Sequence, residues 1–226
     1  MKLKAIVMDM DGTITRFNLD YMGARRQALK ELERMNLRTP EMTEQISIYI
    51  ILKNLKDRAN PLDFVLVRRK LYNLLEEMEL RAAQEVTLYP GAVQTLQELR
   101  SRSIKIGIVT NNGRAGTELT LKRFNLKSYF DAIVTRDDSE KVKPDPDPIL
   151  MALGEMNATP HEAIVVGDGV MDILAAKAAG VASVAVATGP FTSERLLQVE
   201  PDYLLGSVND LPTLIDSIIT TGESSA

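Results

Sequence analysis

Short apolar runs recur along the chain and predict the strands of a sheet. These runs are Ala5–Met8, Ile104–Val109, Ala132–Thr135, Ala163–Val166, Ala182–Ala187 and, more weakly, Tyr203–Leu205. Between most of them the apolar positions follow the spacing of a helix, as in Gly91–Arg100, Thr117–Phe124, Ile149–Met156 and Ile173–Ala179. Strands that alternate with helices form βαβ units, so the pattern predicts an α/β fold with a doubly wound parallel sheet and helices on both faces.

The alternation is interrupted after the first run by a block with helical spacing only. Its helices are predicted at Asp20–Asn36, Pro40–Lys56 and Pro61–Ala83. A block of this size is too long for an ordinary crossover connection. We therefore predict a small all-helical cap domain at residues 17–86, inserted after the first strand of a core formed by residues 1–16 and 87–226. The linkers between the two are expected at Thr15–Phe17 and Thr87–Tyr89.

Composition excludes several classes of protein and of site. The 226 residues suffice for one sizeable core and a smaller unit, and a net charge of −4 without a basic run argues against nucleic acid as a partner. No apolar stretch approaches the ~20 residues that span a bilayer, so no membrane partner is expected. The chain has no cysteine and a single histidine, His161, which excludes disulfides, thiolate chemistry and histidine-rich metal sites. We therefore expect a cytoplasmic protein, either a monomer or a homodimer.

The acidic excess lies outside the helical block. Residues 17–86 hold 12 basic and 11 acidic side chains, whereas the rest of the chain holds 15 and 20. Two of the acidic residues, Asp9 and Asp11, directly follow the first predicted strand, and Gly12 behind them marks a turn. Crowded carboxylates are unfavourable unless a cation, a proton or a reaction uses them. Taken alone, the pair could be no more than a strand-end turn.

Further polar groups follow the second, third and fourth predicted strands. These are Thr110, Asn111, Lys143, Asp168 and Asp172. Open parallel sheets bind ligands outside the carboxyl ends of their strands, so these side chains are predicted to form one site with Asp9 and Asp11. Its oxygen ligands, without histidine or cysteine, favour a hard cation such as Mg²⁺.

Two of these assignments have alternatives. Thr110 and Asn111 could instead cap the helix that begins near Gly113, although a helix N-terminus that binds phosphate also needs its cap. Lys141 competes with Lys143 as the lysine of the site, and the proline that follows Lys143 favours the latter.

The order of these groups resembles the pattern of the haloacid dehalogenase superfamily, an Asp-x-Asp-Gly-Thr motif followed by a Ser or Thr, a Lys and an acidic motif. The matching residues here are Asp9-Met10-Asp11-Gly12-Thr13, Thr110, Lys143, Asp168 and Asp172. The resemblance covers essentially the whole chain. It implies a Rossmann-like core with a helical cap between the first and second motifs, as in the branch that includes phosphoglycolate phosphatases. Asn112 stands where those phosphatases often carry a lysine.

The resemblance also implies a role for each residue. Asp9 would attack phosphorus and form an aspartyl-phosphate, and Asp11 would act as general acid and then as general base. Mg²⁺ would be held by the carboxylates of Asp9 and Asp168 and by the carbonyl of Asp11. Asp172 would either orient Lys143 or a metal-bound water, or ligate the metal directly. The substrate-binding residues implied in this way are Gly12, Thr110, Asn111 and Lys143, the last of which would also counter charge in the transition state.

The predicted function is therefore that of a Mg²⁺-dependent phosphatase acting on a small phosphorylated metabolite. The carboxylate of Asp11 distinguishes it from the dehalogenases of the superfamily, which need no general acid there and use no Mg²⁺. A phosphotransferase or mutase similar to phosphoglucomutase is the first alternative. A non-catalytic scaffold that binds a partner through its cap is the second. Residues 17–86 carry no readable code for the substrate.

Overall fold

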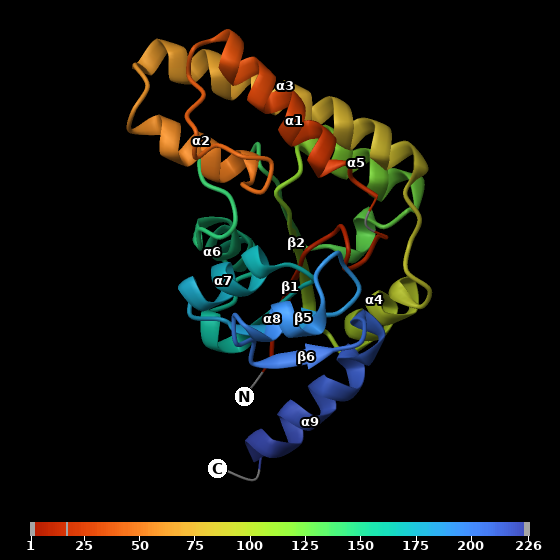
Figure 1. Cartoon of the computed structure of the whole chain (residues 1–226). Helices are drawn as coiled ribbons and strands as arrows, with labels where there is room; N and C mark the ends of the chain where they lie inside the picture. The colour runs from red at the N-terminus through yellow and green to blue at the C-terminus, as the bar shows by residue number, and fades with distance from the viewer. Residues whose placement is uncertain (1–2, 17, 224–226) are drawn as a thin grey trace. The chain divides into compact units, whose positions relative to one another are not determined.

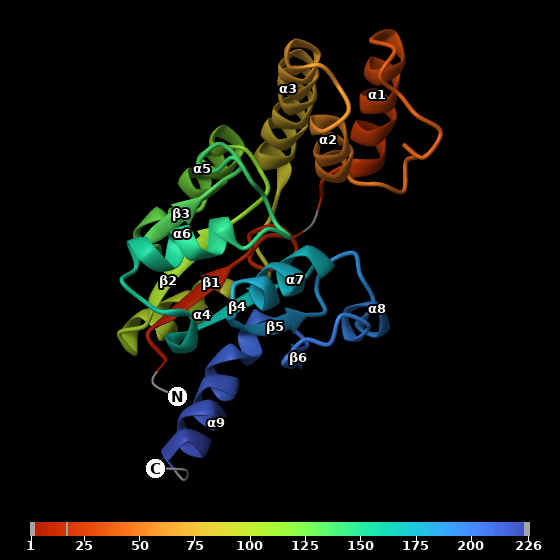
Figure 2. The same cartoon turned by 90° about the vertical axis from the view of Figure 1, so that its left-hand side faces the viewer.

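The protein is described by a computed structural model that covers residues 3–16 and 18–223 (Figures 1 and 2). Its strands are β1 (Ala5–Met8), β2 (Lys105–Val109), β3 (Ala132–Val134), β4 (Ala163–Gly167), β5 (Ala182–Val186) and β6 (Tyr203–Leu205). Its helices are α1 (Tyr21–Arg34), α2 (Ile48–Lys56), α3 (Pro61–Glu85), α4 (Ala92–Ser101), α5 (Arg114–Arg123), α6 (Asp147–Glu155), α7 (Val170–Ala178), α8 (Ser193–Leu197) and α9 (Leu211–Glu223), with short 3₁₀ turns η1 (Lys127–Tyr129), η2 (Pro160–Glu162) and η3 (Val208–Asp210). None of the helices in these two ranges is both long enough and apolar enough to cross a membrane.

The strands form one parallel sheet in the order β3-β2-β1-β4-β5-β6. Near its centre, Met8 of β1 is in register with Ile108 of β2 and Val166 of β4. The chain winds outward from β1 in both directions, so the strand order reverses between β1 and β4. In sheets of this kind ligands bind at that reversal, outside the carboxyl ends of the strands. The prediction of a doubly wound, Rossmann-like α/β fold is confirmed.

Both faces of the sheet are covered by helices. Successive residues of a strand point to opposite faces, and in β1 both sets are apolar. Ile6 and Met8 pack with residues of α4, α5 and α9, whereas Ala5 and Val7 pack with residues of α6 and α7. All four side chains are at most 1% exposed. β1 is therefore the fully buried strand that its unbroken apolar sequence predicts.

The chain divides into two compact units, Met1–Asn18 with Val86–Ala226 and Leu19–Glu85. The second unit contains α1, α2 and α3 and has an apolar core of its own, in which Leu32, Ile51 and Leu71 are inaccessible to solvent. The interpretation of this unit as a cap domain with limits at 17 and 86 stays a proposal. Phe17, at the start of the predicted cap and in the first predicted linker, lies outside the described residues.

The second helix of this unit is shorter than predicted. We expected a helix over Pro40–Lys56, but residues 40–47 form turns and α2 begins at Ile48. Ser47 sets this start, because its side chain accepts a hydrogen bond from the N–H of Ile50 at 3.3 Å and caps the helix. Met42 continues the helical spacing of apolar residues in the sequence. It is buried, although it lies in the non-helical segment before α2. Burial there follows from tertiary packing and not from helical periodicity.

The structure contains two helices that the pattern does not predict, α8 and α9. α8 has only 5 residues, too few for a periodic signal. In α9, Leu211 and Ile215 are inaccessible to solvent and join the core cluster that also contains residues of α4. The spacing of Leu211, Ile215 and Ile218 is typical of a helix. The polar residues from Thr220 onward made the end of the chain read as a polar tail, so the helix was not predicted.

Candidate active site

The carboxyl ends of three neighbouring strands bring predicted residues together. Asp9 follows β1, Thr110 follows β2 and Asp168 follows β4. The N–H of Asp9 donates to the carbonyl of Val166 at 2.8 Å, which continues the pairing of β1 with β4 beyond the strand. Because β1 lies between β2 and β4, these three residues leave the sheet side by side. The point at which strand order reverses is thus lined with polar groups.

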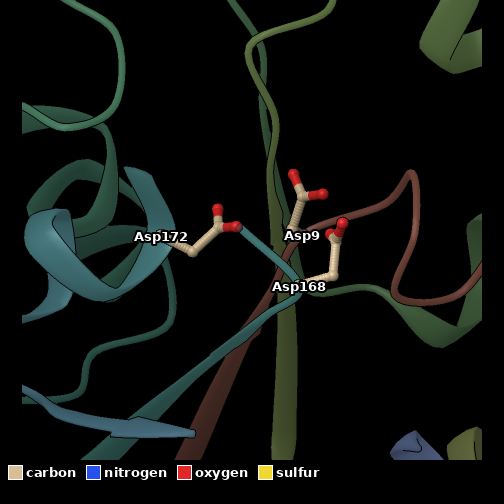
Figure 3. Close-up of side chains that lie close together, drawn as sticks. All are labelled: Asp9, Asp168 and Asp172. Carbon is tan, nitrogen blue, oxygen red and sulfur yellow. The ribbon is translucent and has the colours of Figure 1, made fainter. Parts of the chain in front are cut away.

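Three carboxylates gather at this edge of the sheet (Figure 3). Asp9, Asp168 and Asp172 each place one carboxylate oxygen within 4.8 Å of the others. Asp172 comes from the first turn of α7, where it accepts a hydrogen bond from the N–H of Gly169 at 2.9 Å. The side chains of Asp9 and Asp172 are only 12% and 7% exposed, so solvent screens little of the repulsion among these groups.

Asp168 is enclosed by two glycines. Gly12 has a φ of +86°, which L side chains rarely adopt, and a Cβ there would lie 2.2 Å from Oδ2 of Asp168. A Cβ on Gly189 would lie 1.7 Å from the same oxygen. The hydroxyl of Thr13 donates to Oδ1 at 3.2 Å, and the carbonyl of Gly12 accepts the hydroxyl of Thr188 at 2.5 Å. Only glycine at both positions leaves room for this carboxylate.

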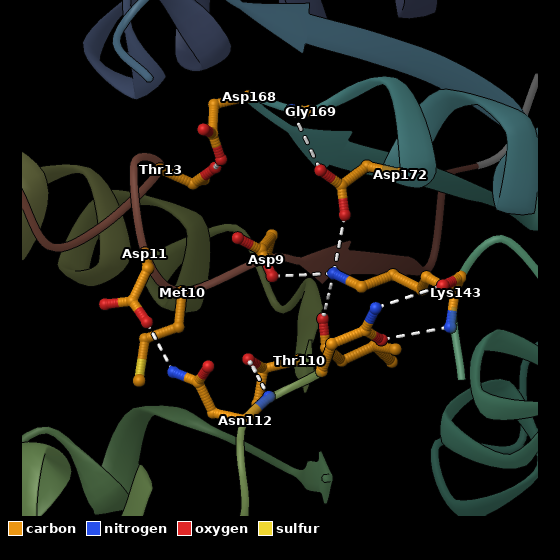
Figure 4. Close-up of polar contacts among 12 residues, drawn as sticks. Asp9, Met10, Asp11, Thr13, Thr110, Asn112, Lys143, Asp168, Gly169 and Asp172 are labelled. Atoms are coloured by element: carbon orange, nitrogen blue, oxygen red, sulfur yellow. Dashed lines mark hydrogen bonds and ion pairs between the residues drawn. The ribbon is translucent and has the colours of Figure 1, made fainter. Parts of the chain in front are cut away.

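Lys143 links two of the carboxylates (Figure 4). Its ammonium donates to Oδ1 of Asp9 at 2.6 Å and to Oδ1 of Asp172 at 2.5 Å. The third ammonium proton is directed to the carbonyl of Val109 at 2.7 Å, so all three donors are used. Lys141, the alternative lysine, is 56% exposed and pairs with surface carboxylates. The structure therefore places Lys143, and not Lys141, among the site residues.

Burial and mutual repulsion control the protonation of these groups. Burial, together with the charge of Asp172, raises the pKa of Asp9 to about 7 against the attraction of Lys143. The pKa of Asp168 is raised well above its usual range by burial and then by the charge of Asp9. Burial also disfavours the charge of Lys143, but the carboxylates of Asp172 and Asp9 outweigh it and raise the lysine pKa. Asp9 and Asp168 therefore resist joint ionisation in the absence of a further cation.

The donor set fits a divalent metal ion. When ionised, Asp9, Asp168 and Asp172 carry three negative charges and Lys143 supplies one positive charge, which leaves two negative charges uncompensated in a buried site. The available donors are oxygens, and the single histidine of the chain, His161, is an exposed residue of η2. Hard divalent cations prefer such oxygen ligands.

The carboxylate of Asp11 lies outside this group of three (Figure 4). Its Oδ1 accepts the hydroxyl of Thr15 at 2.7 Å, and its Oδ2 accepts the side-chain amide of Asn112. The predicted metal set includes Asp11 through its backbone carbonyl, and that contribution stays a prediction. Asn112 contacts the site through Asp11 but was not predicted as a site residue. It follows the same strand as Thr110 and Asn111, so its position in the sequence did not single it out.

The predicted phosphate-binding residues after β2 are held by hydrogen bonds. The side chain of Asn111 clamps the backbone of Lys143, because its Oδ1 accepts the Lys143 N–H and its Nδ2 donates to the Lys143 carbonyl, both at 3.0 Å. The hydroxyl of Thr110 accepts the N–H of Asn112 at 3.1 Å. Substrate binding by Thr110 and Asn111 stays a prediction. The geometry gives Asn111 a further role, which is to hold the lysine loop.

The helix α5 begins directly behind these residues. Its N-cap is Gly113, so the alternative in which Thr110 or Asn111 caps the helix does not apply. The N–H of Arg114, the first residue of α5, donates to Asp137 at 2.7 Å. A carboxylate from the loop after β3 therefore already occupies part of the helix terminus at which a phosphate was expected.

Arg136 is a buried cation that was not among the predicted site residues. It follows β3 and is 2% exposed. Its guanidinium donates to the carbonyl of Asn111 at 3.1 Å, and its N–H donates to the carbonyl of Asn112 at 3.0 Å. Arginine is rarely buried unless its charge is paired or hydrogen-bonded. Its position behind a strand, the signal used for Asp168, could have identified it.

The chain is similar to known proteins over most of its length. A family described as haloacid dehalogenase-like hydrolase matches residues 6–186, a span that includes all the predicted site residues. The pyrophosphatase PpaX of Bacillus pumilus is 38% identical over 130 residues, which are 58% of this chain and 60% of that protein. PpaX of Bacillus mycoides is 30% identical over 218 residues, 96% of this chain and 99% of that protein. The solved structure of a hydrolase from Pseudomonas syringae has a TM-score of 0.71 at 26% identity and covers 95% of this chain and 99% of its own.

Proposed function

The chain belongs to the haloacid dehalogenase-like hydrolase family, and we propose that within this family it is a Mg²⁺-dependent phosphatase of small phosphorylated metabolites. The observation that carries the proposal is the buried group of Asp9, Asp168 and Asp172 with the ammonium of Lys143 between two of them. Phosphoryl transfer needs a positioned nucleophile and cations that offset the charge of the phosphoryl oxygens. This group supplies the nucleophile, one fixed cation and the ligands for another.

In the first step of the proposed reaction Asp9 is the nucleophile. One of its oxygens forms a bond to phosphorus while the bond between phosphorus and the leaving oxygen breaks, which gives an aspartyl-phosphate. Asp11 gives a proton to the leaving oxygen, which departs as an alcohol. Lys143 offsets the charge of the transferred group from its position 2.6 Å from the Asp9 carboxylate.

In the second step water releases the phosphate. Asp11, now ionised, takes a proton from a water molecule whose oxygen bonds to phosphorus as the bond to Asp9 breaks. The products are inorganic phosphate and the regenerated Asp9 carboxylate. Mg²⁺ held by Asp9 and Asp168 would reduce the repulsion between these carboxylates and the phosphoryl group. Asp172 is assigned to orienting Lys143, because its Oδ1 lies 2.5 Å from the lysine nitrogen.

The proposed substrate is a phosphomonoester, and inorganic pyrophosphate is the second candidate. The second candidate is favoured by the full-length similarity to a relative named as a pyrophosphatase. Both substrates present a phosphoryl group to Asp9, but they differ in the leaving group, which is an alcohol in one case and phosphate in the other. Phosphate leaves more easily, so its departure depends less on a proton from Asp11.

A screen for phosphate release tests this proposal. The protein would be assayed on sugar phosphates, other alkyl phosphates and pyrophosphate, each with MgCl₂ or with EDTA. We expect at least one substrate with a kcat/KM of about 10⁴ M⁻¹s⁻¹ or more, and loss of that activity in EDTA. Isomerisation of a sugar phosphate that depends on a bisphosphate activator would instead identify a mutase. No turnover, together with no complex between Mg²⁺ and a fluoride analogue of phosphate, would favour a scaffold.

Mg²⁺ is expected to stabilise the protein more at pH 8 than at pH 5. Because the pKa of Asp9 is about 7 in the metal-free fold and 3.8 ordinarily, the folded state binds more protons than the unfolded state between these values. Stability of the metal-free protein therefore falls as pH rises through this window. Mg²⁺ binds the ionised carboxylates and reverses the loss, by about 2.7 kcal/mol at a concentration a hundred times its Kd.

Thermal unfolding of EDTA-treated protein measures this effect. At pH 8, MgCl₂ should raise the Tm by roughly 5 °C or more, whereas at pH 5 protons compete for the carboxylates and the shift should be less than half as large. NaCl at the same ionic strength is the control for screening. Equal Mg²⁺ shifts at the two pH values would contradict a metal site built on Asp9.

A further inference from the structure

We propose that Asn112 is a positioning residue for Asp11 and fixes the direction in which that carboxyl group faces the leaving oxygen. The inference rests on the proposed phosphatase function, because it concerns the group that protonates the leaving oxygen. The side-chain amide of Asn112 donates to Asp11. The hydrogen bonds described for Lys143 and for the three carboxylates do not involve this side chain.

The carboxylate of Asp11 accepts hydrogen bonds from two side chains. The amide of Asn112 donates to Oδ2 (Figure 4). The hydroxyl of Thr15 donates to Oδ1 at 2.7 Å. The two donors come from different segments, since Thr15 lies in the turn after β1 and Asn112 in the loop after β2. A carboxylate held by one donor can turn about its side-chain bonds, whereas two donors on separate segments leave it one orientation. Asn112 therefore supplies one of the hydrogen bonds that constrain the Asp11 carboxylate.

The main chain of Asn112 is held by hydrogen bonds of its own. Its N–H donates to the hydroxyl of Thr110 at 3.1 Å, and its carbonyl accepts the N–H of Arg136 at 3.0 Å. The residue is 4% exposed, so water does not compete for its amide. These bonds hold the main chain from which the amide reaches Asp11, before any substrate binds. Such preorganisation lowers the cost of reaching a reactive geometry.

The same loop positions the lysine of the site. The neighbouring residue, Asn111, holds the N–H and the carbonyl of Lys143 through its side chain, both at 3.0 Å. The side-chain amides of Asn111 and Asn112 thus hold Lys143 and Asp11. In the proposed reaction these two residues act at the phosphorus end and at the oxygen end of the bond that breaks. Lys143 faces the phosphoryl oxygens, and Asp11 faces the leaving oxygen. The separation of these two functions in space is set by one short loop between β2 and α5.

The role of Asn112 predicts a dependence on the leaving group. An alkoxide leaves slowly unless it is protonated, whereas 4-nitrophenolate leaves without a proton. Because kcat/KM includes only the steps up to the departure of the leaving group, it reports the use of Asp11 as an acid and not its later use as a base. A disturbed Asp11 should therefore lower kcat/KM for alkyl phosphates and spare it for 4-nitrophenyl phosphate. A general loosening of the site would affect both substrates alike.

Asn112→Ala tests the inference with these two substrates. We expect a loss of about 30- to 100-fold in kcat/KM for an alkyl phosphate that the wild type hydrolyses, and less than about threefold for 4-nitrophenyl phosphate. Asn112→Ser, which keeps a hydroxyl donor, should recover part of the loss. Asn209→Ala is the matched control, since it removes an amide that donates to the carbonyl of Pro90 at 2.9 Å, and it should leave both values unchanged.

The outcomes separate the inference from the proposed function. Equal losses of kcat/KM on the two substrates, or no loss on either, would overturn the positioning role of Asn112. A wild-type protein that hydrolyses no phosphomonoester would refute the proposed function itself. Thermal unfolding establishes that each variant is folded, and if Asn112→Ala is not, Asn112→Leu supplies the same comparison. That variant keeps a side chain of similar size and loses the donor without adding a charge beside Asp11, so the alkyl phosphate should again suffer the larger loss.

Discussion

Asp9→Asn is expected to lower kcat by at least about 10⁴-fold while the protein keeps its fold. The amide has the shape of the carboxylate but cannot attack phosphorus, so no aspartyl-phosphate forms. The fold should survive because the residue lies at the end of β1, whose own side chains are fully packed, and because a neutral side chain has no charge to desolvate. Phosphate release gives kcat, and mass spectrometry of acid-quenched protein detects the phosphorylated intermediate.

Asp147→Asn is the matched control for this variant. Its carboxylate, in the first turn of α6, is 45% exposed and pairs with Lys141 on the surface. Loss of such a pair changes stability little. We expect kcat within about twofold of the wild type and an intermediate that is still detected. Substantial hydrolysis by the folded Asp9→Asn protein would rule out Asp9 as the nucleophile.

Lys143→Met should remove a structural contact and a catalytic charge at once. The side chain is 4% exposed, and its ammonium is the shared partner of Asp9 and Asp172. Removal of one member of a buried ion pair leaves an uncompensated charge, at a cost of about 3–5 kcal/mol. We expect metal-free protein to lose stability of this order at pH 8, as measured by urea unfolding. The kcat should fall by about 10³-fold, since the charge on the phosphoryl oxygens loses its fixed cation.

Lys141→Met is the control that distinguishes the loss of Lys143 from the loss of any lysine in the same loop. Its ammonium is 56% exposed and makes only surface ion pairs, so we expect a change in stability of about 0.5 kcal/mol or less and a kcat within about twofold of the wild type. Losses of similar size in the two variants would show that the effect comes from the loop and not from the buried ammonium.

The strands were more predictable than the helices. The buried strand β1 is apolar on both faces, so its sequence is a continuous run, and Ala5–Met8 was predicted with the observed limits. The edge strand Tyr203–Leu205 is only partly buried, yet its limits were also predicted. Helix starts depend on single capping contacts. Ser47 moves the start of α2 well beyond Pro40, and no periodicity in the apolar residues could reveal that.

The positions of site residues followed from topology, whereas their partners did not. Asp9 and Asp168 had to meet because the carboxyl ends of parallel strands share one edge of the sheet. The amide contact of Asn112 depends on the side-chain directions of a loop, which its residue types leave open. The burial of Arg136 likewise depends on carbonyl groups that face it from another strand end.

The two glycines that enclose Asp168 bear on the size of the cation that the site can accept. Gly12 and Gly189 lie against Oδ2, so the backbone of two loops bounds the carboxylate on these sides. Ca²⁺ takes about six to eight oxygens at roughly 2.3–2.6 Å in adaptable geometry, whereas Mg²⁺ requires a near-octahedral shell at about 2.0–2.1 Å. A carboxylate held in one place by backbone suits the strict shell of Mg²⁺ better than the adaptable shell of Ca²⁺. The backbone of two loops, and not the chemistry of the ligands, would then discriminate between the two metals.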